Sequence, residues 1–382
     1  MFKTSFFFLA LLCLSCFVQG QHVLNKQFNS PRASDIIVKQ RVEYKDPGRC
    51  GANVLWNFSK LKTLDDSYTL AYSQVGDSIV GTEHRTNYYY TLRGDSLLLN
   101  GYQNPTTWVK NVRPELLLKY PVQFGDSLTS YYQGYGKYSN ELLLQTMGVA
   151  TVKTDAYGMM IMPGGDTLKN VLRVHTHKRL TDKTDGLYKW NFVHLLSLPP
   201  VNTDSIDFRL ENDSAVWEIE TLRWYEGGYR YPIFETMRSV IVKNGSVKEL
   251  FNMSFFYPPQ VHYYLNDDPD NLAVLEEDES KDHNQGGDCE DDNLPGEDIL
   301  NYNLHSDLNS NTTTLEFHLE QGAEVSIYLY DMQGRILVTH PKEYYSSGYY
   351  SRTIDLPDSG MKQFLLRIIV NEKSYTEKLV KR

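Results

Sequence analysis

Two histidines at alternate positions, His175 and His177, first suggest chemistry by their type and spacing. They lie in a β-branched stretch, residues 168–178, where alternate side chains of a strand point to the same face. A metal site would need at least one further ligand, together with groups that orient the ligands. No third His or Cys lies nearby in the sequence. We therefore expect two surface or partly buried histidines, and we predict no cofactor.

A serine nucleophile is the second chemistry to consider, at Ser127 in the Gly-Asp-Ser-Leu tetrapeptide of one esterase class. That class supplies the base and the acid beside the serine through a late Asp-x-x-His motif. No histidine of this chain has Asp three residues before it. Similar tripeptides recur at residues 76–78, 94–96 and 165–167, and Gly and Asp favour turns. We predict turns here and no catalytic serine.

Aromatic residues gather in short clusters at residues 88–90, 131–132, 224–231 and 255–257. Alternation along a strand would place half of each cluster on an outer face, where Tyr and Trp stack on sugar rings or anchor a protein partner. Core packing is the competing interpretation. Carboxylates are spread too evenly to nominate a glycosidase pair. A carbohydrate or protein ligand is therefore a hypothesis beside core packing, and we predict no catalytic, cofactor-binding or metal-ligating residue.

The elements that position these residues are predominantly strands. The chain has 382 residues, enough for two globular units, and its 28 tyrosines favour sheet. Alternating β-branched or aromatic segments separated by Gly, Asp, Asn and Ser occur near residues 35–45, 69–74, 86–92, 142–152, 168–178, 188–196, 214–223 and 230–242. We predict an all-β chain, with a β-sandwich-like passenger domain over residues 21–265.

The first twenty residues have the pattern of a signal peptide, with Lys3, an apolar run and small residues before Gln21. The run is too short to cross a bilayer, and no later segment is long and apolar enough, so we expect no transmembrane segment in the mature chain. A lipoprotein signal at Cys13 or Cys16 is the alternative. Cys50 and Cys289 then remain, and in an oxidising compartment we expect a disulfide between them, with two free thiols as the alternative.

Charge is concentrated in one segment. Residues 267–298 hold fourteen Asp and Glu against one basic residue, Lys281, so the rest of the chain has a small net positive charge. Such a stretch buries too little apolar surface to offset its ordering entropy, and we predict an acidic disordered linker over residues 266–298. The calcium-loop ligand spacing is absent from it. No basic stripe is present, which argues against nucleic-acid binding.

Residues 299–382 contain about six short alternating segments and form a second predicted β unit, a small Ig-like β-sandwich. Within it, an alternating strand ends in Asp-x-x-Gly-Arg (Asp331, Gly334, Arg335), a turn carries Gly360, and the chain ends in Lys-Leu-Val-Lys (Lys378, Leu379, Val380, Lys381). In order, spacing and terminal position these residues resemble the C-terminal sorting domain of the type IX secretion system of Bacteroidota. The family's opening Pro-Asn-Pro-like segment and a later Gly-x-Tyr are replaced here.

This resemblance implies an export route. The chain would reach the periplasm by its signal peptide, be recognised by the outer-membrane translocon, and end as a secreted or cell-surface protein. Segments 51–61 and 154–176 are also similar to uncharacterised passengers of this route, which transfers no activity. Asp-Ser or Asp-Thr before a small or aliphatic residue resembles the O-glycosylation sequence of Bacteroidota, and it occurs at Ser78, Ser96, Ser127, Thr167, Ser205 and Ser214.

The sequence thus predicts an exported protein with a non-catalytic binding role and a C-terminal sorting domain. A secreted hydrolase acting on carbohydrate or ester substrates is the alternative. The two differ in what the fold should bring together, either a flat or aromatic binding surface or a deep pocket with converging catalytic groups.

Overall fold

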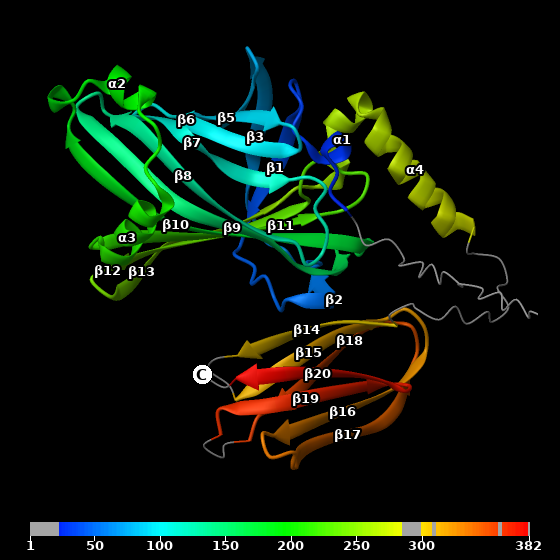
Figure 1. Cartoon of the computed structure of the whole chain (residues 1–382). Helices are drawn as coiled ribbons and strands as arrows, with labels where there is room; N and C mark the ends of the chain where they lie inside the picture. The colour runs from blue at the N-terminus through cyan, green and yellow to red at the C-terminus, as the bar shows by residue number, and fades with distance from the viewer. Residues whose placement is uncertain (1–22, 285–298, 308–310, 358–360, 381–382) are drawn as a thin grey trace, which may run out of the picture.

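The structure is a computed structural model that describes residues 23–284, 299–307, 311–357 and 361–380. Strands dominate it, which confirms the predicted all-β class. They form two bodies, a large barrel and a smaller C-terminal unit (Figure 1).

The barrel is one antiparallel sheet of twelve strands that closes on itself where β9 pairs with β10. In order around the barrel, the strands are β10 (Thr167–Gly186), β11 (Ala215–Tyr225), β12 (Phe234–Lys243), β13 (Ser246–Phe256), β1 (Ile36–Val42), β3 (Thr63–Val75), β4 (Ser78–Glu83), β5 (Thr86–Arg93), β6 (Ser96–Gln103), β7 (Thr107–Lys119), β8 (Ser127–Tyr138) and β9 (Leu142–Ile161).

Closure is where the structure differs from the predicted sandwich. β1 lies between β13 and β3 and so joins two runs of consecutive strands, β10 to β13 and β3 to β9. The barrel closes where the far ends of these runs, β10 and β9, pair with each other. Each of these strands therefore has a partner on both sides, which pairs the backbone groups that open sheets leave at their edges. A strand alternates in the same way in a sandwich and in a barrel, so the sequence pattern could not separate the two.

Short helices lie outside the wall beside the long strands. After β10 come η1 (Leu187–Lys189), α2 (Phe192–Ser197) and α3 (Thr203–Asn212), where a strand was predicted over residues 188–196; that prediction is wrong. The Asn191 side chain accepts a hydrogen bond from the His194 amide and so caps α2. None of the helices that the structure describes is long and apolar enough to cross a membrane.

One end of the barrel is closed by the segments that enter and leave it, which we call the plug. It consists of residues 23–35, with α1 (Lys26–Asn29), and residues 258–271, with η2 (Pro259–Val261), η3 (Tyr263–Asp267) and the first turn of α4 (Pro269–Asn284). Figure 1 shows α1 and α4 together at this end. Leu24 is fully buried there, in a cluster with Tyr120 and Val122.

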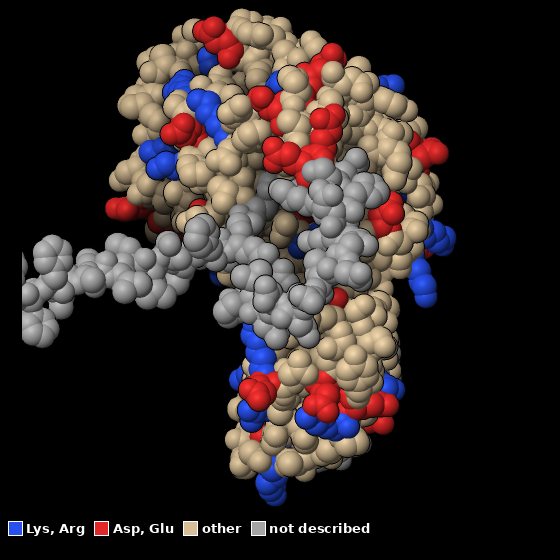
Figure 2. Space-filling view, turned by 90° about the vertical axis from the view of Figure 1, so that its right-hand side faces the viewer, with Lys and Arg blue, Asp and Glu red and all other residues tan. Residues whose placement is uncertain are grey.

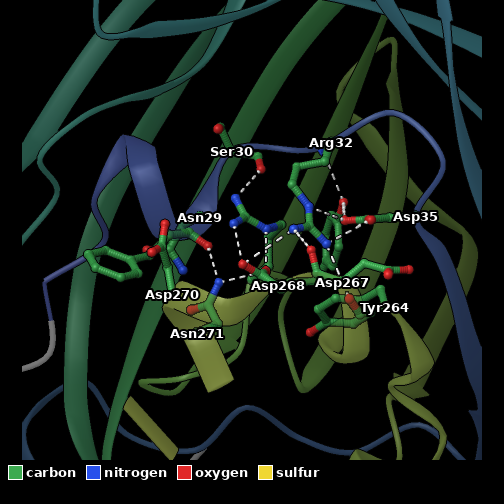
Figure 3. Close-up of polar contacts among 12 residues, drawn as sticks. Asn29, Ser30, Arg32, Asp35, Tyr264, Asp267, Asp268, Asp270 and Asn271 are labelled. Atoms are coloured by element: carbon green, nitrogen blue, oxygen red, sulfur yellow. Dashed lines mark hydrogen bonds and ion pairs between the residues drawn. The ribbon is translucent and has the colours of Figure 1, made fainter. Parts of the chain in front are cut away.

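A buried polar network fastens the two halves of the plug (Figure 3). The Asp268 carboxylate accepts hydrogen bonds from Arg230 Nε and Nη2 at 2.7 and 2.8 Å, and from Asn271 Nδ2 at 2.8 Å. Arg32 Nη1 lies 3.4 Å from the same carboxylate and donates to the carbonyl of Asp267. Buried charges persist in a fold when their hydrogen-bonding groups are satisfied, as they are here.

The predicted disordered linker differs from the structure at its start. Asp268 and Asn271 are buried in the plug, and α4 extends over the acidic residues to Asn284. The Asn271 side chain donates to the carbonyl of Phe28, which ties α4 to the N-terminal half of the plug. Composition indicated a solvated tether, but specific contacts anchor its first residues. The remainder of the predicted linker, residues 285–298, lies outside the described residues.

The C-terminal unit has two sheets that share one core. One sheet contains β14 (Leu300–Asp307), β15 (Thr312–Leu319) and β18 (Gly348–Asp355); the other has the order β17 (Ile336–Tyr345), β16 (Ala323–Asp331), β19 (Gln363–Val370) and β20 (Lys373–Val380). Apolar side chains from both sheets form a single cluster, with Phe317 and Phe364 fully buried. This core is separate from the barrel's own clusters.

The two bodies meet at a polar joint around β2 (Gly51–Asn57), which pairs in parallel with β9 and contacts β14 at Tyr302. Arg49 is the centre of this joint. Its Nε donates to the carbonyl of Tyr302 at 3.1 Å, its Nη1 lies 3.3 Å from Glu377, and its guanidinium lies 3.8 Å from the Tyr302 ring centroid. Polar contacts centred on this one cation therefore help to hold the two bodies together.

Arg49→Ala is expected to loosen the joint without unfolding either body. Hydrogen bonds from a charged group contribute about 1.5–3 kcal/mol each to stability, and the variant removes several at once. Hydrogen exchange at the amides of β2 and β14 should become faster, while exchange in the core of each body stays as in the wild type. Arg352→Ala, which removes an exposed arginine of the C-terminal unit, is the control. Unchanged protection of β2 and β14 would refute this role of Arg49.

Acidic and basic side chains are intermixed on the face of the molecule that Figure 2 shows. Figure 2 shows the side of the molecule that carries α4, and basic side chains there lie in small groups interspersed with acidic ones.

Candidate functional site

The face of each barrel strand that points inward follows from the packing. Leu97 of β6 and Leu118 of β7 pack in one cluster with Leu172 and Val174 of β10, although β10 pairs with neither strand. Side chains from unpaired strands can meet in this way only across the interior. Because paired residues of an antiparallel sheet share a face, the register extends the assignment around the wall.

The interior is not a fully packed core. Arg223, which is in register with inward Val174, keeps 38% of its side-chain surface accessible, and inward Lys178 keeps 22%. Tyr88 and Tyr90, on the inward face of β5, are only half-buried. A barrel of eight strands is just filled by its own side chains, whereas wider barrels enclose space. The accessible surface inside this twelve-stranded barrel agrees with that rule.

Three ion pairs line the inner wall: Arg223 with Glu235, Lys39 with Glu83, and Lys178 with Glu115. Burial acts to raise the pKa of the Glu235 carboxyl, but Arg223 and Lys39 outweigh it and hold that pKa below its usual value. Burial likewise acts to lower the pKa of the Arg223 guanidinium, and the charge of Glu235 reverses the effect. The Arg223–Glu235 pair therefore stays ionised.

Tyrosines form a row along the same wall, which we call the tyrosine row. Its members are Tyr102, Tyr88, Tyr90 and Tyr72, and successive ring centroids lie 6.4, 6.5 and 6.3 Å apart. At the plug the row reaches Tyr231, whose ring stacks on Tyr72 at 5.3 Å. Burial raises the pKa of Tyr102 to about 12, so its hydroxyl remains a hydrogen-bond donor at neutral pH.

Two inward polar atoms, the hydroxyl of Tyr132 and Oδ1 of Asp182, have no hydrogen-bond partner among the described residues. The Tyr132 residue is buried, and Lys178 Nζ lies 5.3 Å from its ring centroid. Both atoms have almost no accessible surface, so they are polar positions within the wall and not open contact points. The interior thus combines aromatic faces with paired charges that remain partly accessible, which is an arrangement suited to binding.

A hollow of about 150 Å³ lies on the outer wall beneath residues 44–50. Cys50 lines it with Asp155, Arg173 and His175, and Cys50 Sγ lies 3.3 Å from an Asp155 oxygen. Burial and the neighbouring carboxylate raise the pKa of the Cys50 thiol. The thiolate is the reactive form, so this environment suppresses nucleophilic chemistry.

The two histidines do share a face of β10, as predicted, and it is the outer face. His175 lies 3.7 Å from both Asp155 and Glu220. Among the residues that the structure describes, no group of three or more His, Cys, Asp or Glu side chains is arranged to hold a metal ion.

The predicted Gly-Asp-Ser turns are confirmed. Residues 76–78 and 94–96 join β3 to β4 and β5 to β6, and Gly76 and Gly94 have φ near +59° and +57°, a conformation that favours glycine. Ser127 follows Gly125, with φ of +89°, and begins β8. Of the predicted modification sites, Ser127, Thr167, Ser205 and Ser214 are exposed, while Ser78 and Ser96 are half-buried.

The aromatic clusters do not form the outer platform considered above. Tyr88, Tyr90 and Tyr132 point inward, while Trp224 is buried against Trp56 under β2. Alternation was a sound guide to which residues share a face. It could not show that one of those faces encloses a space.

The interior charges Lys39, Arg223 and Glu235 were missed by the sequence analysis. Glu235 stands between Ile233 and Met237, at the position of its strand where alternation expects an apolar residue, whereas Arg223 alternates with Leu222 and Trp224 and has the pattern of a solvent-facing residue. A charge at a core position was therefore the available signal, and it acquires meaning only when its partner on another strand is known.

Three of the residues of the sorting resemblance, Asp331, Gly334 and Arg335, meet in the β16–β17 turn. The buried Asp331 carboxylate accepts hydrogen bonds from the amides of Gln333 and Arg335 at 2.9 and 2.8 Å, and from Arg335 Nε at 2.6 Å. Gly334 has φ of +82°. Arg335 itself keeps 72% of its side chain accessible.

The terminal motif lies on β20, an edge strand of its sheet. Lys378 and Val380 are exposed, and Leu379 is buried in the core. Gly360 and Lys381 lie outside the described residues. Cys50 is a free thiol in the structure, and Cys289, its predicted partner, also lies outside the described residues, so the disulfide stays a prediction.

Two comparisons with known proteins add nothing to these observations. No protein-family model matches the chain. A search of curated proteins finds no significantly similar sequence.

Proposed function

We propose that this chain is an exported protein with two parts: a barrel with a non-catalytic binding role, and a C-terminal Ig-like sandwich that acts as a type IX sorting domain. The signal peptide, residues 1–20, would deliver it to the periplasm, and the outer-membrane translocon would carry it to the cell surface or the medium. A carbohydrate or a protein is the expected class of ligand.

The observation that carries the sorting proposal is the independence of the C-terminal unit. It has its own core and meets the barrel at a polar joint, so a partner could recognise or remove it without exposing the barrel's core. Arg335 and Lys378 are exposed, and among the described strands β20 pairs only with β19, so an extended segment of another protein could add to its other edge.

The ion pairing of the carboxylates on the inner wall supports the binding role. Glu83, Glu115 and Glu235 each pair with a cation. A general acid needs a carboxyl with a raised pKa, whereas the pKa of Glu235 is lowered by its partners. Glu235 is therefore better suited to hold a ligand than to protonate one, whereas burial raises the pKa of a different inward carboxyl, Asp182.

Removal of residues 299–382 is expected to abolish surface delivery while leaving the barrel folded in the periplasm. Because the barrel has its own cores and a closed sheet, it should keep its thermal transition after the deletion. Cells with a type IX system would be fractionated, and the amount of each form at the surface and in the periplasm measured by immunoblot.

The converse fusion is the matched control: residues 299–382 attached to an unrelated periplasmic protein should carry that protein to the surface. Undiminished arrival of the deletion variant at the surface would contradict the sorting proposal, and so would retention of the fusion in the periplasm.

A further inference from the structure

We propose that the interior of the barrel binds a neutral oligosaccharide, which stacks on the tyrosine row and hydrogen-bonds to the ion pairs of the inner wall. This inference rests on the binding role proposed above and names the ligand class of that site.

Stacking surfaces are the first requirement. Sugar rings have apolar C–H faces that pack on aromatic rings, while the tyrosine hydroxyls at the ring edges bond to sugar hydroxyls. Tyr102, Tyr88, Tyr90 and Tyr72 follow one another at nearly even spacing, so the row offers a track for several linked rings instead of a pocket for one.

Hydrogen-bonding groups are the second requirement. Arg223 lies beside Tyr72, Tyr90 and Glu235, and more than a third of its side chain remains accessible after it has paired. Lys178, which keeps 22% of its side chain accessible beside Glu115, supplies a further group nearer the end opposite the plug. Sugar hydroxyls both donate and accept, so they can satisfy donor and acceptor atoms together.

Charge balance selects a neutral ligand. The three cations of the ion pairs face three carboxylates, Arg41 is in register with Asp65, and Asp182 adds one further inward carboxylate. A wall of this kind has little net attraction for an anion such as an acidic sugar or a phosphate. It also disfavours an acyl chain, since apolar contact with Arg223 and Lys178 would take these charges out of water without new hydrogen bonds.

The plug determines how the ligand would enter. Residues 23–35 and 258–271 close one end, while α2 and α3 pack on the outer wall and leave the opposite end to hairpin turns. A flexible sugar chain could thread into that end along the tyrosine row, whereas a folded protein domain is too wide for the interior of a twelve-stranded barrel.

Isothermal titration calorimetry of the mature chain, residues 21–382, would test the proposal. The neutral probes are maltohexaose, cellohexaose, laminarihexaose and chitohexaose; hexagalacturonate and palmitate represent acidic sugars and acyl chains. At least one neutral probe is expected to bind, and the other two classes are not.

Tyr88→Ala should weaken binding of that probe by about tenfold, since an aromatic contact is worth about 0.5–1.5 kcal/mol and each 1.4 kcal/mol is tenfold in affinity. Tyr88→Phe keeps the ring and should retain most of the affinity. Tyr89→Ala is the matched control: Tyr89 is the next residue of β5, it points outward, and its hydroxyl donates to Gln103. Its loss should leave affinity unchanged.

Several outcomes would overturn the proposal: no neutral probe binds, hexagalacturonate or palmitate binds in preference, or Tyr89→Ala weakens binding as much as Tyr88→Ala. If Tyr88→Ala fails to fold, as judged by circular dichroism, an affinity of Tyr88→Phe equal to that of the wild type supports the proposal and loss of its binding rejects it. The fractionation experiment is independent of these results, so a failure here leaves the sorting proposal in place.

Discussion

Arg173→Ala is expected to lower the free energy of unfolding by about 3–5 kcal/mol, the cost of removing one partner from a buried ion pair. Arg173 is 1% exposed, and its Nε and Nη2 donate to Asp155 at 2.8 and 3.0 Å. Its guanidinium carbon lies 5.7 and 5.8 Å from the ring centroids of Trp56 and Trp224. Alanine would leave the Asp155 carboxylate buried without its partner.

The effect should extend beyond the pair, because Arg173 also donates to the carbonyls of Pro47 and Arg49. These residues lead into β2, which carries the joint to the C-terminal unit. Urea unfolding followed by tryptophan fluorescence would measure the change. Arg179→Ala is the control, since Arg179 lies on the same strand, is 39% exposed and pairs with Glu218 on the surface. Surface pairs contribute about 0–1 kcal/mol. Equal losses in the two variants would show that Arg173 has no special role.

Asp268→Ala is the second substitution expected to have a large effect, again about 3–5 kcal/mol. It would leave Arg230 buried without a carboxylate and would free α4 from the plug. Asp270→Ala is the matched control: Asp270 lies two residues further on, is exposed and accepts a hydrogen bond from Gln27. The loss should be small there, and amide exchange in residues 23–35 should increase only in Asp268→Ala.

The contribution of the Asp268 carboxyl to stability should depend on pH. Burial acts to raise the pKa of Asp268, but the hydrogen bonds from Arg230 and Asn271 outweigh it and hold the pKa below its usual value. As the pH falls, the unfolded chain therefore takes up the proton first, near pH 3.9, and the stabilisation by Asp268 is lost through the folded-state pKa. The stability difference between the wild type and Asp268→Ala should shrink below about pH 4. A difference that grows with acid would contradict this assignment.

Local features were the easiest to predict from the sequence. Gly76 and Gly94 were expected in turns because Gly and Asp suit left-handed backbone, and the structure has them there. The segment 188–196 was misassigned as a strand because its aromatic and β-branched residues outweighed the Asn191 cap in the sequence pattern. The predicted linker began too early in the chain, because composition cannot show that Asp268 forms ion pairs with Arg32 and Arg230.

The sequence by itself determined that this chain is built of strands, because alternation and turn chemistry act between residues close together in the chain. It also determined which side chains share a face. Only the tertiary structure decided that one such face encloses the tyrosine row and pairs Arg223 with Glu235, because closing a sheet depends on which distant strands meet as β9 meets β10. The same holds for Arg49, whose partners in the C-terminal unit lie more than 250 residues away and are brought to it only by the packing of the two bodies.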